Sequence, residues 1–182
     1  MIDLALLRDH FPIDGELVRL SVFTEVNITD SYLSWLNDPE VVRYSNQRFR
    51  QHTVRTSMDY LQTFVGTENI FLTVSLKDNE KYVGTMSVYF FSEHKVADIG
   101  IMIGDRTCWG KGVGGDAWST ILSFLIDTVE IRKVTGGTLS CNKSMAKIMA
   151  NSGMRSDGAR LRHELIDGQE VDVVMFAKFR HV

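Results

Sequence analysis

A glycine-rich turn, Gly110-Lys111-Gly112-Val113-Gly114-Gly115, constrains the fold of this chain more than any other feature. It joins a strand-like run at 96–103 to an apolar helical pattern over 114–128. Glycines at such a turn let the backbone approach a ligand closely, and the helix that follows offers unpaired N–H groups and a partial positive charge. The turn therefore predicts a site for a phosphate or diphosphate.

The rest of the chain alternates between strand and helix patterns. Short polar turns separate the strands that precede the glycine turn, which indicates an antiparallel meander followed by a single crossover. This order predicts one α+β or mixed α/β domain over residues 1–182. The expected strands are 16–23, 70–76, 82–91, 96–103, 133–141, 160–166 and 169–179. The expected helices are 30–36, capped by Thr29 or Asp30 and ended by Asp38-Pro39; 54–65, with Val54, Met58, Leu61, Phe64 and Val65 inward; 114–128; and one from Asn142 or Ser144 to Gly153.

Composition excludes several classes of protein. A net charge of −3 argues against a dedicated nucleic-acid binder. The two cysteines, Cys108 and Cys141, are too few for a four-ligand zinc site, and we expect reduced, partly buried thiols and no metal. The N-terminus lacks the basic start of a secretory signal, and no run reaches about 18 apolar residues. We therefore expect a cytoplasmic protein that does not contact a membrane.

The glycine turn does not fit a P-loop. That motif needs four residues between its glycines and a Ser or Thr after its lysine. Five residues separate Gly104 from Gly110, and the residue after Lys111 is Gly112. Both requirements fail.

A dinucleotide fingerprint fits only in its letters. Gly110, Gly112 and Gly115 satisfy G-x-G-x-x-G. That motif should follow the first strand of a parallel set, with an acidic residue ending the next strand. Here a meander precedes the turn, and the next strand ends Leu139-Ser140-Cys141. A turn with a purely structural role remains open, although one or two glycines would serve it.

The same residues resemble the acetyl-CoA loop of the GCN5-related N-acetyltransferase (GNAT) superfamily. Its pattern is Gln or Arg, two residues, Gly, one residue, then Gly or Ala, at the start of the central helix. Gly112 and Gly114 match the glycines, whereas Trp109 stands at the Gln or Arg position.

Three further segments resemble the branch of ribosomal-protein N-terminal (RimJ/RimL-type) acetyltransferases. Residues 35–41, Trp-Leu-Asn-Asp-Pro-Glu-Val, are similar to the first helix of that branch and its exit. Asp98-Ile99-Gly100 resembles its E-I-G strand motif, and Asn142 followed by Gly153-Met154 resembles its N-x-x-S … G-F helix. Four motifs in register cover nearly the whole chain.

The resemblance implies a mixed, mostly antiparallel seven-stranded sheet flanked by about four helices and splayed between strands 4 and 5. It also implies acetyl-CoA as the cosubstrate, with pantetheine lying against the fourth strand. The implied cofactor-binding residues are Ile101, Met102, Ile103, Trp109, Gly110, Lys111, Gly112, Val113, Gly114, Gly115 and Asn142.

Catalysis by such a protein moves an acetyl group to a primary amine by direct transfer in a ternary complex. Asp98 occupies the carboxylate position of the family and could accept the proton of the amine through water; it could also be a strand-edge residue that orients a loop. Asn142 could contact pantetheine or order a water, and it could equally cap its helix. Met149 stands where many relatives carry a tyrosine acid, so we assign no general acid.

The acceptor is expected to lie under the segment that joins the first two helices. Tyr44, Arg48, Arg50 and His52 could bind a phosphate or sugar there, or belong to a solvated loop. The acceptor could be a protein N-terminal amine or an amino sugar, perhaps linked to a nucleotide, bound by a monomer or homodimer. A module that binds acetyl-CoA without catalysis, and a nicotinamide enzyme, are the competing hypotheses.

Overall fold

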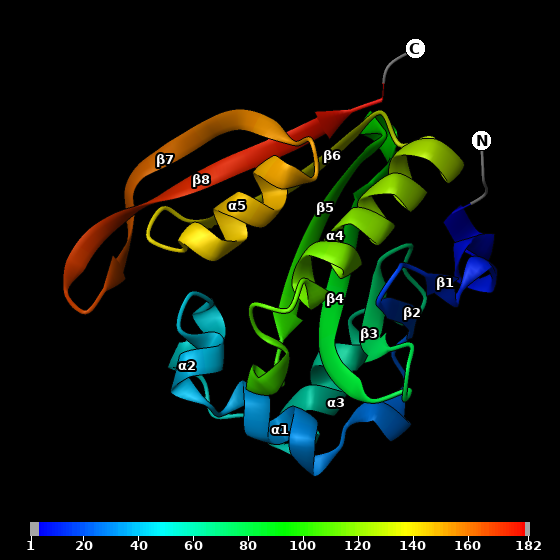
Figure 1. Cartoon of the computed structure of the whole chain (residues 1–182), viewed down its shortest axis with the longest axis horizontal. Helices are drawn as coiled ribbons and strands as arrows, with labels where there is room; N and C mark the ends of the chain where they lie inside the picture. Colours follow the sequence, from blue (N-terminus) through cyan, green and yellow to red (C-terminus); the bar gives the residue numbers. More distant parts are fainter. Residues whose placement is uncertain (1–3, 181–182) are drawn as a thin grey trace.

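The computed structural model describes residues 4–180 of the chain (Figure 1). It contains one eight-stranded sheet in the order β1-β2-β3-β4-β5-β6-β8-β7, in which only β5 and β6 pair in parallel. The strands are β1 (Ile13–Asp14), β2 (Val18–Val22), β3 (Ile70–Leu76), β4 (Tyr82–Phe91), β5 (Val96–Ile103), β6 (Lys133–Leu139), β7 (Arg155–Ile166) and β8 (Gln169–Phe179). The expected class, a mixed and mostly antiparallel sheet, is confirmed.

The helices in the described residues are α1 (Asp30–Leu36), α2 (Pro39–Val42), α3 (Val54–Gln62), α4 (Val113–Ser123) and α5 (Lys143–Asn151). Local chemistry fixes their starts. The Thr29 side chain accepts a hydrogen bond from the Tyr32 amide at the start of α1. Asp38 caps α2 in the same way, with Pro39 at the first helical position. Asp38-Pro39 therefore ends one helix, as expected, and also begins another.

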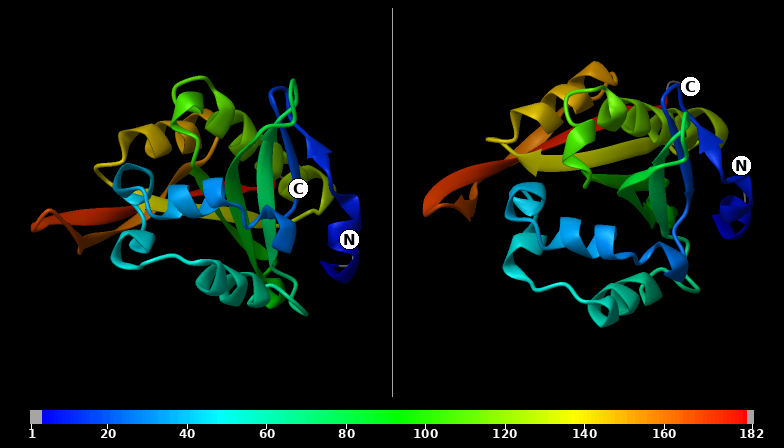
Figure 2. Two further views of the ribbon diagram at one scale, coloured as in Figure 1. Left: turned by 90° about the horizontal axis from the view of Figure 1, so that it is seen from below. Right: turned by 60° about the horizontal axis from the view of Figure 1, so that its bottom comes forward.

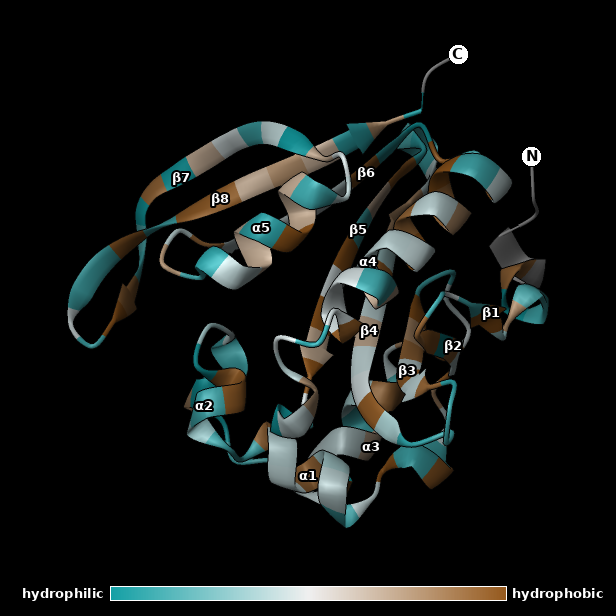
Figure 3. Cartoon of the chain, in the orientation of Figure 1, coloured by the Kyte–Doolittle hydropathy of each residue, from teal (hydrophilic) through white to brown (hydrophobic). Residues whose placement is uncertain are grey.

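Helices lie on both faces of the sheet (Figure 2), and a hydrophobic cluster fills the space on each side. The alternation along β5 shows how one strand serves both. Ile99, Ile101 and Ile103 belong to the large core beneath α4 and α5, whereas Met102 packs with the aromatic cluster under α1 and α3. Successive side chains of a strand point to opposite faces, so this division follows from the backbone alone. The brown segments along β5 in Figure 3 mark this apolar strand.

Several boundaries differ from the sequence prediction. The sheet has one more strand than expected because Ile13–Asp14 pairs with β2, and two residues carry no readable pattern. Strand β7 starts at Arg155 rather than residue 160. The expected helix 54–65 ends at Gln62, which leaves Val65 beyond it at 63% exposure; Val54, its first residue, is 56% exposed. The prediction that both valines face inward is wrong.

The C-terminal hairpin turns at Asp167 and Gly168, with φ of 51° and 78°, as the Asp-Gly pair predicts. Its strands extend away from the body of the sheet in Figure 1. The ladder between β7 and β8 shifts register between Arg160 and Glu164. That bulge re-aims the side chains on either side of it.

No helix within residues 4–180 has the length and apolar character that a membrane crossing needs. Those residues also hold no group of three His, Cys, Asp or Glu side chains that could hold a metal ion. Cys108 is a buried free thiol and Cys141 a half-buried one.

Candidate functional site

Strands β5 and β6 pair briefly and then part. Their parallel ladder holds three residue pairs, Val96↔Lys133, Ala97↔Val134 and Asp98↔Thr135. Beyond it, β5 continues beside β4 and β6 continues beside β8. The backbone of residues 99–103 therefore has one edge paired with β4 and one edge that faces the gap. Ile101, Met102 and Ile103 lie along that open edge.

The glycine turn lies at the end of this edge, where it begins α4. Gly110 and Gly112 have φ of 72° and 85°, a region that glycine enters without strain. Gly112 is the N-cap, and its carbonyl accepts the first bond of the helix from the Asp116 amide at 2.9 Å. The amides of residues 113–115 precede that bond, so the helix offers them to a ligand.

Trp109 anchors this loop to the sheet. Its Nε1 donates a 2.8 Å hydrogen bond to the carbonyl of Ile103, the last residue of β5. The guanidinium of Arg106 lies 5.6 Å from the centre of the Trp109 ring and 3.5 Å from a carboxylate oxygen of Asp38. The loop is thus tied both to β5 and to the start of α2.

Helix α5, which follows β6 on the other side of the gap, packs beside the glycine loop. The position of a Cβ on Gly114 would lie 3.4 Å from Ile103 and 3.5 Å from Ile148 of α5, so the two helices approach closely there. Asn142 is the N-cap of α5, and its side-chain oxygen accepts from the Met145 amide at 3.2 Å. Its predicted capping role is observed.

Asp116, in the first turn of α4, holds the turn between β1 and β2. Its carboxylate accepts hydrogen bonds from the amides of Glu16, Leu17 and Val18 at 3.1, 2.8 and 3.0 Å. A Cβ on Gly15 would lie 2.5 Å from the same carboxylate, which explains a glycine at that position. Three amides thus offset a negative charge at the helix end where the free amides lie.

A groove of about 580 Å³ opens on the face of the sheet opposite α4. Its floor comes from β4, β5 and β6, and its wall from the β7–β8 hairpin and the segment after α2. It is lined by Tyr44, Asn46, Tyr89, Phe91, Asp98, Thr135, Gly137, Thr138, Leu139, Arg160, Glu164, Val173 and Met175.

Asp98 stands where the groove meets the gap. Thr135 donates a hydrogen bond to its Oδ2 at 2.6 Å, and Tyr89 lies directly opposite on β4. Burial raises the pKa of Asp98, and the Thr135 hydrogen bond partly opposes that rise. Tyr89 is itself held by the Tyr60 hydroxyl at 2.8 Å. A half-buried carboxylate with a raised pKa is suited to accept a proton.

A family model described as an acetyltransferase (GNAT) domain matches residues 18–155, about three quarters of the chain. The chain belongs to the GNAT acetyltransferase family. The resemblance on which the sequence prediction rested is therefore confirmed, and with it the assignment as an acetyltransferase. No curated protein sequence matches the chain significantly.

Solved structures share the fold of this GNAT domain at low sequence identity. RimL, a ribosomal L7/L12 α-N-protein acetyltransferase in complex with coenzyme A, has a TM-score of 0.81 at 13% identity, covering 92% of this chain and 97% of RimL. A spermidine N-acetyltransferase chimera of Vibrio cholerae SpeG and hSSAT gives 0.78 at 13% identity, covering 91% and 96%. The microcin C7 self-immunity acetyltransferase MccE, with acetyl-CoA and AMP, gives 0.76 at 16% identity, covering 91% and 93%.

The predicted acceptor residues of the GNAT domain do not all gather in the groove. Tyr44 lines it. Arg48 forms an ion pair with Glu164 at 3.2 Å. His52 stays within its own segment, where its ring contacts the Gln47 carbonyl at 3.2 Å, and Arg50 is exposed outside the groove lining.

Six polar residues of the groove were not singled out from the sequence: Asn46, Tyr89, Thr135, Thr138, Arg160 and Glu164. Thr135 comes from β6, and Arg160 and Glu164 come from β7. Thr135 contacts Asp98 only because of the parallel register, which the sequence does not specify. Arg160 and Glu164 both fall within the expected strand 160–166, but the sequence does not show the register shift between them or which part of the sheet the hairpin lies beside.

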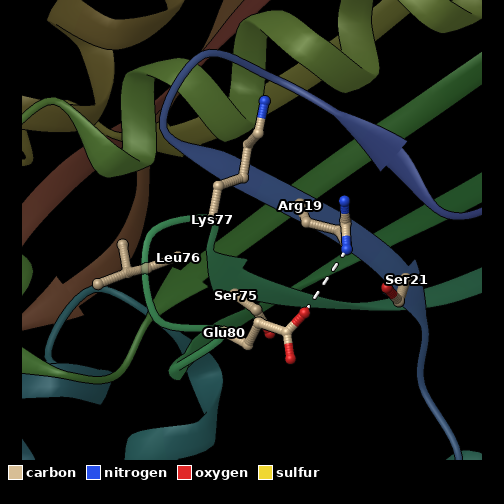
Figure 4. Close-up of a pocket in the computed structure, with 6 residues that line it drawn as sticks. All are labelled: Arg19, Ser21, Ser75, Leu76, Lys77 and Glu80. Atoms are coloured by element: carbon tan, nitrogen blue, oxygen red, sulfur yellow. Dashed lines mark ion pairs between the residues drawn. The ribbon is translucent and has the colours of Figure 1, made fainter.

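A second hollow, of about 220 Å³, lies over β2 and β3 (Figure 4). The charged residues that line it, Arg19, Lys77 and Glu80, already form ion pairs with one another or with Asp14. Arg19 contacts Asp14 at 2.8 Å and Glu80 at 3.8 Å. The Arg19 hydrogen bond lowers the pKa of Asp14, and the same contact raises the pKa of Arg19. This exposed network is compatible with a surface feature of the GNAT domain rather than a second site.

Proposed function

We propose that this GNAT domain transfers an acetyl group from acetyl-CoA directly to a primary amine while both are bound. The observation that carries the proposal is the early parting of β5 and β6, which leaves an open strand edge leading to a helix with free amides. An extended arm can add to such an edge as a further strand, and a diphosphate suits the helix end.

The residues of the loop fit a diphosphate. A Cβ placed on Gly110 or Gly115 would meet no heavy atom within 4 Å, so the surface of the loop is open to a ligand. RimL and MccE were solved with coenzyme A and acetyl-CoA, which supports the same ligand here. In this proposal, residues 109–115 hold the diphosphate and the backbone of residues 101–103 holds pantetheine. Acetyl-CoA supplies a thioester carbonyl that an amine can attack.

Asp98 would accept the proton that the attacking amine loses, directly or through water. An aspartate at its ordinary pKa of about 3.9 is a weak base. Burial of Asp98 moves its pKa upward, toward the range in which a base is effective. The Thr135 hydrogen bond fixes the direction of the carboxylate.

Asn142 would contact pantetheine through the side-chain amide group that its capping bond leaves free. Met149, at the position of the family tyrosine, is fully buried. We assign no side chain as the acid that protonates the departing thiolate; water can do so.

The acceptor would enter by the groove, from the opposite face to acetyl-CoA. Asp98 belongs to both the groove and the end of the gap, so two ligands can meet there without either leaving first. This supports direct transfer in a ternary complex. Tyr44 is the predicted acceptor residue that the groove lining supports; Arg48, Arg50 and His52 stay predictions. A protein N-terminal amine and an amino sugar remain the two candidate acceptors.

The test compares wild type with Asp98→Asn in a thiol-release assay over a panel of primary amines, with calorimetry of coenzyme A binding beside it. We expect turnover to fall by about 100-fold or more, with binding of coenzyme A unchanged. Binding without turnover on any amine would instead favour a non-catalytic module. Absence of binding would refute both.

A further inference from the structure

The charged residues of the groove are unequally compensated. Three of its lining residues carry charge: Asp98 on the floor, and Arg160 and Glu164 on the hairpin wall. The net effect on a ligand depends on which of these charges another side chain already balances. A balanced pair offers a ligand little, whereas a charge without a partner attracts one of opposite sign.

Glu164 is balanced by Arg48. Their side chains are 14% and 23% exposed for Arg48 and Glu164, and a nitrogen of Arg48 lies 3.2 Å from Oε2 of Glu164. The same guanidinium donates to the carbonyls of Ser45 and Leu165 at 2.9 and 3.3 Å. Its carbon also lies 4.3 Å from the centre of the Phe49 ring. Arg48 therefore already has a carboxylate partner and two carbonyl acceptors, and it joins the segment after α2 to the hairpin.

Arg160 forms no ion pair with any side chain in residues 7–180. It sits opposite Val173 on β8, at the last pair before the register shift, and both residues line the groove. The groove lining near it includes Val173 and Met175 of β8 and Leu139 of β6, which are apolar. Arg160 is exposed, so water rather than a carboxylate solvates this guanidinium, and an anionic ligand in the groove can replace that water.

Arg160 and Asp98 lie at opposite ends of the groove. Three strand spacings separate β5 from β7, about 14 Å at the usual spacing. Arg160 also aligns through Val173 with Leu139, four residues further along β6 than Thr135, the partner of Asp98. A ligand that reaches both groups must carry its two polar ends several bonds apart.

We propose that the acceptor is a primary amine carrying an anionic group, carboxylate or phosphate, several bonds from the amine, and that Arg160 binds the anion. The amine lies at Asp98 and the anion at the hairpin wall. This inference rests on the proposed function, because it takes Asp98 as the point where the amine reacts. It replaces Arg48 with Arg160 as the arginine that recognises the acceptor.

The test uses the full chain and a series of linear primary amines of equal length. The distal ends are carboxylate, phosphate, carboxamide or ammonium. We expect wild type to prefer an anionic end by about tenfold or more in kcat/KM over carboxamide. The carboxylate and phosphate arms show which anion is recognised. KM for acetyl-CoA serves as an internal reference.

Three variants of Arg160 sharpen the result. Arg160→Ala should abolish the preference for an anionic end over carboxamide, and Arg160→Lys should retain part of it. Arg160→Glu should reverse it toward the ammonium-ended amine. Arg155→Glu is the matched control, since Arg155 is exposed on the same strand but outside the groove lining; it should keep the wild-type preference.

Equal rates with anionic and carboxamide amines in wild type, or an unchanged ratio in Arg160→Glu, would overturn the inference. Transfer to no amine would be a failure of the proposed function instead. Calorimetry of the same amines, in the presence of coenzyme A, decides the inference in that case. Anion-ended amines must bind wild type more tightly than Arg160→Glu, by a similar factor.

Discussion

Oγ1 of Thr135 donates a 2.6 Å hydrogen bond to Oδ2 of Asp98 at the last residue pair that joins β5 to β6. The candidate base Asp98 is therefore oriented by Thr135, its partner in the last residue pair before β5 and β6 separate. The hydrogen bond lowers the pKa of Asp98 while burial raises it. Two opposing effects of this kind can be separated by substitution.

Thr135→Val should move the acid limb of the pH–rate profile to higher pH. The valine has a similar shape but donates no hydrogen bond, so the ionised form of Asp98 loses stabilisation and its pKa rises further. Initial rates of acetyl transfer from pH 4 to 9, in about half-unit steps, measure this shift. A Thr135→Ser variant, which keeps the hydroxyl, should retain the wild-type profile; a limb that moves in neither variant would exclude Asp98 as the titrating base.

The stability of the protein should depend on Asp98 in a defined direction. Its pKa is higher in the folded than in the unfolded chain, so the folded state holds its proton more tightly. The stability that this contributes is present below the unfolded pKa of about 3.9 and is lost as pH rises through the folded value.

Urea denaturation measures the free energy of unfolding of wild type and Asp98→Asn, from below the unfolded pKa of Asp98 to above its folded pKa. The difference between the two proteins removes the contribution of the other carboxylates. The stability of the variant relative to wild type should increase as pH rises. An increase in the stability of wild type relative to the variant as pH rises would mean that folding lowers the pKa of Asp98 instead.

Gly112→Ala should weaken both folding and coenzyme A binding. The φ of 85° at this N-cap strains any residue with a Cβ, at about 1–2 kcal/mol. Gly168 has φ of 78° in the distant hairpin turn, so Gly168→Ala is a control with matched strain. Both variants should lose similar stability in urea, and only Gly112→Ala should lose affinity for coenzyme A. Equal affinities of the two variants for coenzyme A would show that the glycine loop does not bind the cofactor.

Trp109→Phe should loosen the glycine loop while keeping an aromatic ring beside Arg106. It removes the hydrogen bond from Nε1 to the Ile103 carbonyl, which is worth about 0.5–1.5 kcal/mol. Affinity for coenzyme A should fall with stability, because the loop amides lose their fixed position relative to β5. Calorimetry checks this, and unchanged affinity would show that the loop keeps its shape without the indole anchor.

The sequence predicted best what short segments determine by themselves. The glycine turn, the cap at Asn142 and the Asp-Gly hairpin turn each depend on a few adjacent residues, and each occurs where expected. The meander and the single crossover followed from strand patterns and short turns. The two-residue strand β1 could not be predicted, since its pairing with β2 decides it.

What the sequence left undetermined depends on contacts between distant segments. The acceptor-binding role of Arg48 stays a prediction, and the sequence could not show that Glu164, 116 positions away, pairs with it. Trp109 stands at the Gln or Arg position of the family pattern, and the structure shows that its indole also anchors the loop to Ile103. Pairing across the fold decides what a charged or aromatic side chain is free to do, and one sequence does not report pairing.

Only three residue pairs join β5 to β6, so the sheet consists of two parts that are weakly connected through the backbone. One part has five strands and the other has three, and α4 helps to hold them together where Trp118 packs closely against Gly136. A continuous ladder of hydrogen bonds would make the whole sheet fold cooperatively, but few backbone hydrogen bonds connect the two parts here. A ligand bound in the gap contacts both parts of the sheet. Its binding must therefore stabilise strands far from any atom it touches.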